Sequence, residues 1–432
     1  MDSRQPLLGS AQTGVFASGA VALYTLALLT VVNAFSNIDR YVFSMLLPLV
    51  KHDLQLSDAV LGLLSGAAFA LSYSMLSLPF AFIADRWSRT RLIAIGFACW
   101  STVTALTGAT VSAGQLAGAR FLLGAAEATS LSPSASLLAD RFDLRRRALA
   151  LGVMGTSPAI GMLVSFPIVG LLADRLGWRA AFVAVGIPGV LAALLFGLTV
   201  REPPRAASGP GGRAGVGATL RFLLGSRTYL LLLAGGALTA FELGAFVAWT
   251  PTFLMRVHHL SATRVGALVG VARGPAGIIG SLGIGFLASR LSRRDVRWVP
   301  RILGISMMLL CPVDLLLLFS QDSSVWALSL VLDAFLAAAV MGPCFTIASG
   351  VARPQMRSVA AALFLVFAGV TGQSLGPYFI GRLNDLLTPQ LGALAVRFSL
   401  AAAAGMALLG GIAYWSTGAF LRADAERAAR PE

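Results

Sequence analysis

Residues 56–89 read LSDAVLGLLSGAAFALSYSMLSLPFAFIADRWSR, and residues 260–293 read LSATRVGALVGVARGPAGIIGSLGIGFLASRLSR. The two stretches align without a gap at an offset of 204 residues, and 13 of the 34 aligned pairs are identical. Each is a long apolar run that ends in a basic turn with the pattern Arg-x-Ser-Arg, at 86–89 and 290–293. A repeat of this length inside an apolar chain predicts two like halves.

The composition indicates a membrane protein. Of the 432 residues, 57% are hydrophobic and 12% are charged, and the mean hydropathy is +0.80. Soluble domains carry about a quarter charged residues. Since a membrane span needs about 20 apolar residues, we predict an all-α membrane protein with twelve transmembrane helices in two pseudo-symmetric six-helix bundles. The expected spans are 19–49, 58–85, 90–111, 113–139, 148–173, 179–200, 229–255, 262–289, 298–319, 324–352, 358–384 and 392–420.

The two bundles are expected to meet at a linker. Residues 201–227 contain a Pro-Pro pair and the run SGPGG at 208–212, and such a density of Pro and Gly ends helices. We therefore predict an N-terminal six-helix bundle at 1–200, a cytoplasmic linker at 201–227 and a C-terminal six-helix bundle at 228–432. A second internal match, at an offset of 211, supports this division through the pairs Arg146/Arg357, Gly161/Gly372, Gly170/Gly381 and Asp174/Asp385.

The net charge is +14, and the distribution of the basic residues along the chain indicates its orientation in the membrane. Of the 33 Lys and Arg residues, 23 fall on one side of the expected spans, 7 on the other and 3 within spans. The positive-inside rule then places both termini in the cytoplasm. We expect an integral, multi-pass protein of a bacterial inner membrane, whose basic loops contact lipid headgroups and bind no nucleic acid.

Four charged residues fall inside the expected first and fourth spans. Each buried charge costs about 3 kcal/mol on insertion scales, so such charges usually face the bundle interior in pairs. Asp39 and Arg40 are adjacent and diverge by about 100° around a helix, so each needs its own partner. Arg120 and Glu127 are seven residues apart and share one face. We therefore predict a cluster of these four charges.

The cluster has a functional and a structural interpretation. Burial favours the protonated form of a carboxylate and a nearby arginine favours its charged form, so Glu127 and Asp39 are the expected proton-coupling residues. Arg40 and Arg120 are expected to bind the substrate, because the planar guanidinium suits phosphate and carboxylate groups. The alternative is a fixed ion pair that only joins two helices.

The second half carries its own intramembrane charges. Glu242 aligns, at an offset of 204, one residue from Asp39. We interpret it as a second titrating or substrate-contacting group with Arg273 as partner; the alternative is a structural pair. Asp314 and Asp333 lie nearer span ends and are expected to be packing or interfacial charges. The three cysteines, Cys99, Cys311 and Cys344, lie inside apolar spans and are expected to be buried and unpaired.

Residues 81–89, Ala-Phe-Ile-Ala-Asp-Arg-Trp-Ser-Arg, resemble the signature loop of the major facilitator superfamily, with Ala81 and Ser88 in place of two glycines. The second copy, at 285–290, keeps the first glycine and has Ser for the acidic residue. The resemblance implies a gating role for Asp85, Arg86 and Arg89, in which the acidic residue docks against a neighbouring helix.

A narrower resemblance is to the Spinster family. The stretch Asn37-Ile38-Asp39-Arg40-Tyr41 is similar to its first-helix motif, one residue shorter between Asn and Asp, and the pattern Arg-x-x-x-Gly-x-x-Glu-Ala at 120–128 is similar to its fourth-helix motif. The resemblance implies a proton-linked carrier of lysophospholipids or sphingosine-phosphate-like lipids. We add Asn37, Tyr41 and Ser130 to the expected substrate-binding residues.

Two other functions stay open from the sequence. One is a proton-coupled exporter of drugs or small organic anions; the other is a membrane receptor or scaffold that does not transport. We expect no enzyme, since no nucleophile–base pair, metal spacing or phosphate loop is visible, and hence no cofactor and no metal. The expected partners are a lipid-like or organic-anion substrate, protons and membrane lipids, bound by a monomer.

Overall fold

The computed structural model describes residues 19–203 and 216–430 of the chain, almost all of them helical. The run at 208–212 of the predicted linker lies outside the described residues. The first half contains α1 Gly19–Leu54, α2 Asp58–Arg86, α3 Arg89–Thr107, α4 Ala113–Glu127, α5 Leu131–Arg141, α6 Leu144–Met154 and α7 Ser157–Thr199. The second half contains α8 Val216–Leu224, α9 Arg227–Val257, α10 Ala262–Ser292, α11 Trp298–Phe319, α12 Ser323–Ala337, α13 Met341–Gly350, α14 Arg357–Gly369, α15 Gly376–Leu391 and α16 Ala395–Ala429.

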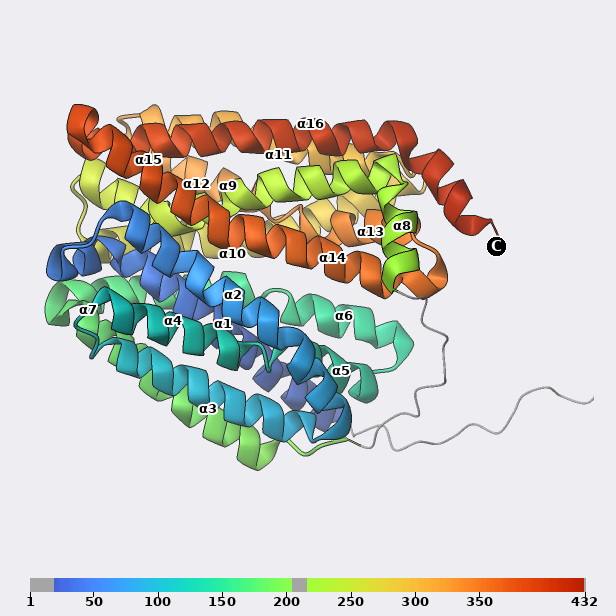
Figure 1. Cartoon of the computed structure of the whole chain (residues 1–432), viewed down its shortest axis with the longest axis horizontal. Helices are drawn as coiled ribbons and strands as arrows, with labels where there is room; N and C mark the ends of the chain where they lie inside the picture. The colour runs from blue at the N-terminus through green and yellow to red at the C-terminus, as the bar shows by residue number, and fades with distance from the viewer. Residues whose placement is uncertain (1–18, 204–215, 431–432) are drawn as a thin grey trace, which may run out of the picture.

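The predicted all-α membrane fold of two like bundles is confirmed, and Figure 1 shows one bundle in blue to green and the other in yellow-green to red. In the described part of the chain, nine helical segments are long and apolar enough to cross a membrane. Two of them, 149–199 and 354–429, have 51 and 76 residues, well above the length of one span. The chain breaks inside them at Gly177 and Gly392, which have φ values of 82° and 54°. The count of twelve spans stays a prediction.

The repeat extends to details of the backbone. Gln55 and His259, which lie 204 residues apart, are the two non-glycine residues with positive φ in the described chain. Each is followed two residues later by a serine that caps a helix: Ser57 accepts the Val60 N–H, and Ser261 accepts the Arg264 N–H. Such caps satisfy amide groups that have no partner inside the helix.

The fourth and the tenth expected spans are each split into two helices at equivalent places. Residues 113–139 form α4 and α5 with a break at 128–130, and residues 324–352 form α12 and α13 with a break at 338–340. The two breaks lie 210 residues apart, so they occupy equivalent places in the two halves. The predicted linker range also contains a helix, α8, directly before α9.

The helix pairs that join the halves include α7 with α10, α2 with α15, and α1 with α9. Glycines permit the close approach. A Cβ at Gly62 would lie 2.3 Å from the Pro377 carbonyl oxygen, and one at Gly170 would lie 2.3 Å from the Ala262 carbonyl oxygen. Both distances are too short for any side chain, so these two positions fix how near the bundles come.

The inter-half contacts gather at one end of the molecule, which we call the latched end. It holds the N-termini of α2 and α10 and lies at the left of Figure 1. The opposite end, which we call the basic end, holds the two Arg-x-Ser-Arg turns. Toward the basic end, equivalent large apolar side chains of α2 and α10 are exposed: Leu78, Phe82, Leu282 and Phe286.

Candidate functional site

A cluster of charged side chains lies inside the N-terminal bundle, between α1, α3 and α4. Arg40 of α1 forms an ion pair with Glu127 of α4, at 2.8 Å between Nη2 and Oε2. Asp39, the neighbouring residue, turns to α3 and accepts a 2.8 Å hydrogen bond from the Thr104 hydroxyl. Asp39 and Arg40 thus have separate partners, as their angular separation on one helix predicts.

Glu127 is the most enclosed member of this cluster. Its side chain is 0% exposed, whereas that of Arg40 is 27% exposed. The Ser36 hydroxyl, one turn before Arg40, donates a 2.5 Å hydrogen bond to Glu127 Oε2. Glu127 is the last residue of α4, and the Ser130 hydroxyl caps the break that follows by donating to the Glu127 carbonyl at 3.0 Å. Ser130 therefore supports the carboxylate's position through the backbone.

Arg120 lies in the same bundle without a described ion pair. Its side chain is buried, and its guanidinium carbon lies 3.7 Å from the centre of the Phe43 ring. Such stacking is a favourable cation–π contact. The Nε and Nη2 atoms of Arg120 have no hydrogen-bond partner among the described residues. A buried arginine with free donors can bind an anion without first breaking an ion pair.

Two predicted substrate-binding residues of α1 make local contacts. The Asn37 side-chain amide donates to the Asn33 carbonyl at 2.8 Å. Tyr41 is buried and packs against the Phe166 ring of α7, with ring centroids 5.7 Å apart. Their contact with a substrate stays a prediction.

The C-terminal bundle contains a second buried cluster, formed by Glu242, Arg273, Asp314 and Asp333. The expected pair of Glu242 with Arg273 is wrong in detail, because Arg273 forms its ion pair with Asp333. The reason is that α10 packs directly on α12. Asp314 and Asp333 are 0% and 1% exposed, so neither is an interfacial charge. The sequence did contain a signal for Asp314 and Asp333 as site residues, because acidic residues inside spans usually mark a functional site.

The predicted gating residues lie at the basic end. Asp85 and Arg86 are exposed. Arg89 is buried and forms ion pairs with Asp140 of α5 at 2.5 Å and with Glu202, after α7, at 2.7 Å. Arg89 therefore joins three segments of one bundle, and its predicted role in a gate between the bundles stays untested.

Glu202 lies outside the expected spans, and its contacts with Arg89 and the neighbouring groups determine its pKa. Partial burial raises the pKa of Glu202, but the Thr90 N–H and the Arg89 and Ser88 side chains outweigh it and hold the pKa below its ordinary value. Hydrogen bonds to the charged form of a carboxylate act in this direction.

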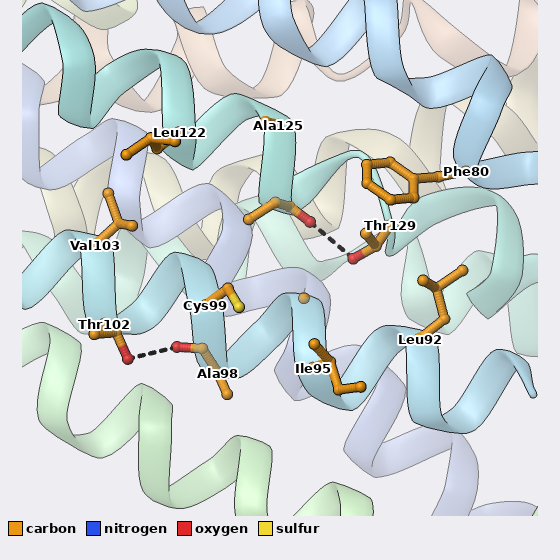
Figure 2. Close-up of a pocket in the computed structure, with 12 residues that line it drawn as sticks. Phe80, Leu92, Ile95, Ala98, Cys99, Thr102, Val103, Leu122, Ala125 and Thr129 are labelled. Carbon is orange, nitrogen blue, oxygen red and sulfur yellow. Dashed lines mark hydrogen bonds between the residues drawn. The ribbon is translucent and has the colours of Figure 1, made fainter. Parts of the chain in front are cut away.

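A groove of about 610 Å³ lies on the N-terminal bundle among α2, α3 and α4. Figure 2 shows its lining, which includes Phe80, Leu92, Ile95 and Leu122. The Thr102 and Thr129 hydroxyls in the lining both donate to carbonyls of neighbouring turns, so the groove is apolar. Cys99 lines it and is exposed, so the prediction that all three cysteines are buried is wrong for Cys99.

Two like helical bundles of membrane-spanning length, each with charged side chains in its interior, define a two-bundle membrane carrier. The chain belongs to the major facilitator superfamily, whose family model matches residues 29–377. Members of this superfamily are transporters, not enzymes. The resemblance drawn from the signature loop is therefore confirmed.

Two relatives within this superfamily are similar to the chain over most of its length. It is 33% identical over 403 residues to an MFS-type efflux pump of Mycolicibacterium smegmatis, covering 93% of this chain and 94% of the pump. It is 28% identical over 435 residues to human Protein spinster homolog 1, covering 93% of this chain and 81% of that protein. The similarity to Spinster proteins is thus confirmed over nearly the whole chain.

Solved structures agree on the fold. A bacterial homologue of the human lysosomal transporter Spinster, in an inward-facing and unoccupied conformation, superposes with a TM-score of 0.83 at 24% identity, covering 94% of this chain and 99% of that one. The nucleoside transporter NupG superposes with a TM-score of 0.71 at 15% identity, covering 91% of this chain and 98% of that one.

Proposed function

We propose that this carrier moves an amphipathic or anionic organic solute in a proton-coupled cycle, and that a lysophospholipid or a sphingosine-phosphate-like lipid is the favoured substrate class. The observation that carries the proposal is the position of Arg40. Its guanidinium is partly exposed, while its partner Glu127 is enclosed. One arginine can therefore serve either the carboxylate or an incoming anion, and it couples the two events.

The coupling follows from the electrostatics of burial. When a phosphate or carboxylate headgroup takes the Arg40 guanidinium, the enclosed Glu127 carboxylate loses its cation. A buried carboxylate without a partner is stable only in the neutral form, so Glu127 takes up a proton. When the anion leaves, Arg40 returns and the proton is released. Asp39, which is next to Arg40 on α1 and accepts a hydrogen bond from Thr104 of α3, is the second proton-coupling residue of this proposal. Arg120 offers its unpaired N–H groups to the headgroup.

The favoured substrate class rests on the similarity to Spinster proteins and on the motifs around Asp39, Arg40 and Glu127. The second candidate is a proton-coupled exporter of drugs or small organic anions. The specific observation in its favour is the 33% identity to the mycobacterial efflux pump, which exceeds the 28% identity to human Protein spinster homolog 1.

The orientation belongs to the same proposal. The excess of Lys and Arg in the loops of the basic end favours a cytoplasmic position for that end and for both termini, in a bacterial inner membrane. The latched end would then face outward. Close contacts at the latched end and exposed apolar side chains at the basic end support an inward-open conformation, in a carrier that works by alternating access as a monomer.

Transport in proteoliposomes tests the proposal. We expect wild-type protein to move a fluorescent lysophospholipid when a pH gradient is imposed, and Glu127→Gln to lose this gradient-driven movement while keeping its melting temperature. Glu426→Gln, the same change on an exposed carboxylate of α16, is the matched control and should behave as wild type.

Three outcomes would contradict it. Unchanged proton coupling in Glu127→Gln would remove the carboxylate from the mechanism. Movement of small aromatic anions that excess lysophospholipid does not inhibit would favour the exporter. Absence of any transport by well-folded wild-type protein, across a panel of both substrate classes, would favour a receptor or scaffold.

A further inference from the structure

The acidic cluster of the C-terminal bundle has no role in the proton coupling described above. Glu242, Asp314 and Asp333 come from α9, α11 and α12, and an oxygen of each lies within 4.8 Å of an oxygen of the others. All three carboxyl groups are at most 1% exposed. Four helices thus converge on one enclosed spot, since α10 adds the Arg273 guanidinium.

One positive charge is not enough for this cluster. Arg273 forms an ion pair with Asp333, which accounts for one carboxylate. Both side-chain oxygens of Glu242 and of Asp314 are buried without a hydrogen-bond donor among the described residues. If every carboxyl group were ionised, the spot would carry an uncompensated charge of about −2 with no access to water, which buried sites in proteins do not sustain.

The neighbouring side chains do not supply the missing charge. The titratable groups nearest the cluster are thiols and phenols, which are neutral or negative and never positive. Cys311 precedes Asp314 by three residues on α11, and Tyr414 of α16 contacts Thr239, three residues before Glu242. Cys344 of α13 contacts Tyr414, and Tyr41 of α1 interacts with Arg273 from the other bundle.

We infer that Glu242, Asp314 and Asp333 form a second proton-binding site, which holds two protons in this conformation, one of them between Glu242 and Asp314. A proton needs no shell of ligands. Metal ions that prefer oxygen, such as Ca²⁺, take 6–8 oxygen ligands, and one of the six carboxyl oxygens here already contacts Arg273. The inference deepens the proposed function and rests on it for one consequence, that the carrier binds and releases protons in both bundles.

Infrared spectroscopy tests the site without any transport measurement. The purified full-length protein at neutral pH should show the carbonyl stretch of protonated carboxyl groups. We expect Glu242→Gln and Asp314→Asn each to remove intensity equal to at least one carboxyl proton. Glu426→Gln should remove none. Two variants are used because either alone could fold poorly, and the wild-type band itself must be present whatever the variants do.

Other results would overturn the inference. A band that both variants leave intact would place the protons elsewhere. A wild-type protein whose melting temperature rises with NaCl but not with choline chloride, and whose Glu242→Gln variant loses that rise, would identify a metal ion instead. A band that Glu242→Gln and Asp314→Asn leave intact would refute this site and leave the proposed function standing if wild-type protein still transports, whereas absence of transport by wild-type protein whose band both variants reduce would do the reverse.

Discussion

Asp174 and Asp385 make the same contact from opposite halves of the molecule. The Asp174 carboxylate, in α7, accepts from the Ala262 and Thr263 amides at 3.2 and 2.8 Å, at the N-terminus of α10. The Asp385 carboxylate, in α15, accepts from the Asp58 and Ala59 amides at 3.0 and 2.8 Å, at the N-terminus of α2. Each half therefore caps a helix of the other, and the two caps are related by the internal repeat.

These caps should control which end of the carrier is closed. An N-cap contributes about 1 kcal/mol, and both caps exist only while the latched end is closed. We expect the double change Asp174→Ala and Asp385→Ala, which removes the accepting oxygens, to shift the equilibrium toward opening at that end by at least roughly tenfold. Distances between spin labels on α2 and α15, measured by pulsed electron paramagnetic resonance, report the shift.

Asp322 offers the control for that experiment. Its carboxylate caps α12 by accepting the Ser324 N–H at 2.8 Å, inside one half. Asp322→Ala should lower stability by about 1 kcal/mol and leave the spin-label distances unchanged. Equal shifts from Asp322→Ala and from the double variant would show that the caps have no special role in closure.

Glycine substitutions should act on the same closure by sterics. Ala is more favourable than Gly in a helix interior by about 1 kcal/mol. At Gly62, however, the added Cβ would lie 2.3 Å from the Pro377 carbonyl oxygen of the other half, whereas a Cβ at Gly285 of α10 meets nothing within 4 Å. We expect Gly62→Ala to hold the latched end apart and to slow transport at least tenfold.

The comparison of the two glycine variants checks this prediction. Gly285→Ala should transport normally and melt at the same or a slightly higher temperature. If Gly62→Ala transports as fast as Gly285→Ala, the approach of α2 to α15 is not needed for the cycle.

The two arginines of the N-terminal cluster should differ when changed. Arg40→Ala leaves the 0% exposed Glu127 carboxylate without its ion pair, and removal of one partner from a buried pair costs about 3–5 kcal/mol. Arg120 stacks on Phe43 and has no described ion pair. We therefore expect Arg120→Ala to raise KM for the solute while proton flux persists, and Arg40→Ala to lose both solute flux and proton flux. Proton flux and solute flux measured in the same vesicles separate the two outcomes.

Sequence reasoning reached the fold and the first cluster because both leave a local signal. Charges such as Asp39 and Glu127 stand out in an apolar run, and the helical period fixes which of them diverge. The partners depended on packing that no local pattern reports. Thr104 is one of many hydroxyls in apolar spans, and nothing in its neighbourhood indicates that it faces Asp39.

The second cluster and the latch show the same limit. The sequence repeat indicated Glu242 as a candidate. The ion pair of Arg273 with Asp333 could not be predicted, because it depends on the tertiary packing of α10 against α12. The pairing of Asp174 with Asp385 in the repeat was visible in the sequence. Their role was not, because the amide groups that they bind come from the opposite half of the chain.

The ion pair between Arg89 and Glu202 at the basic end should make the stability of the fold depend on pH. The pKa of Glu202 is held below its ordinary value, with burial opposed by the Thr90 N–H and by the Arg89 and Ser88 side chains. A carboxylate whose pKa is depressed by folding stabilises the fold above its unfolded pKa, about 4.3, and that stabilisation is lost as the pH falls through the folded value. We expect Glu202→Gln to lower the melting temperature at pH 7 and to have less effect at pH 4, where the wild-type side chain is becoming protonated.

Thermal unfolding of both proteins at the two pH values measures the difference. Glu426→Gln should leave the melting temperature unchanged at both pH values. An effect of Glu202→Gln that is as large at pH 4 as at pH 7 would mean that the side chain acts by packing and not by its charge.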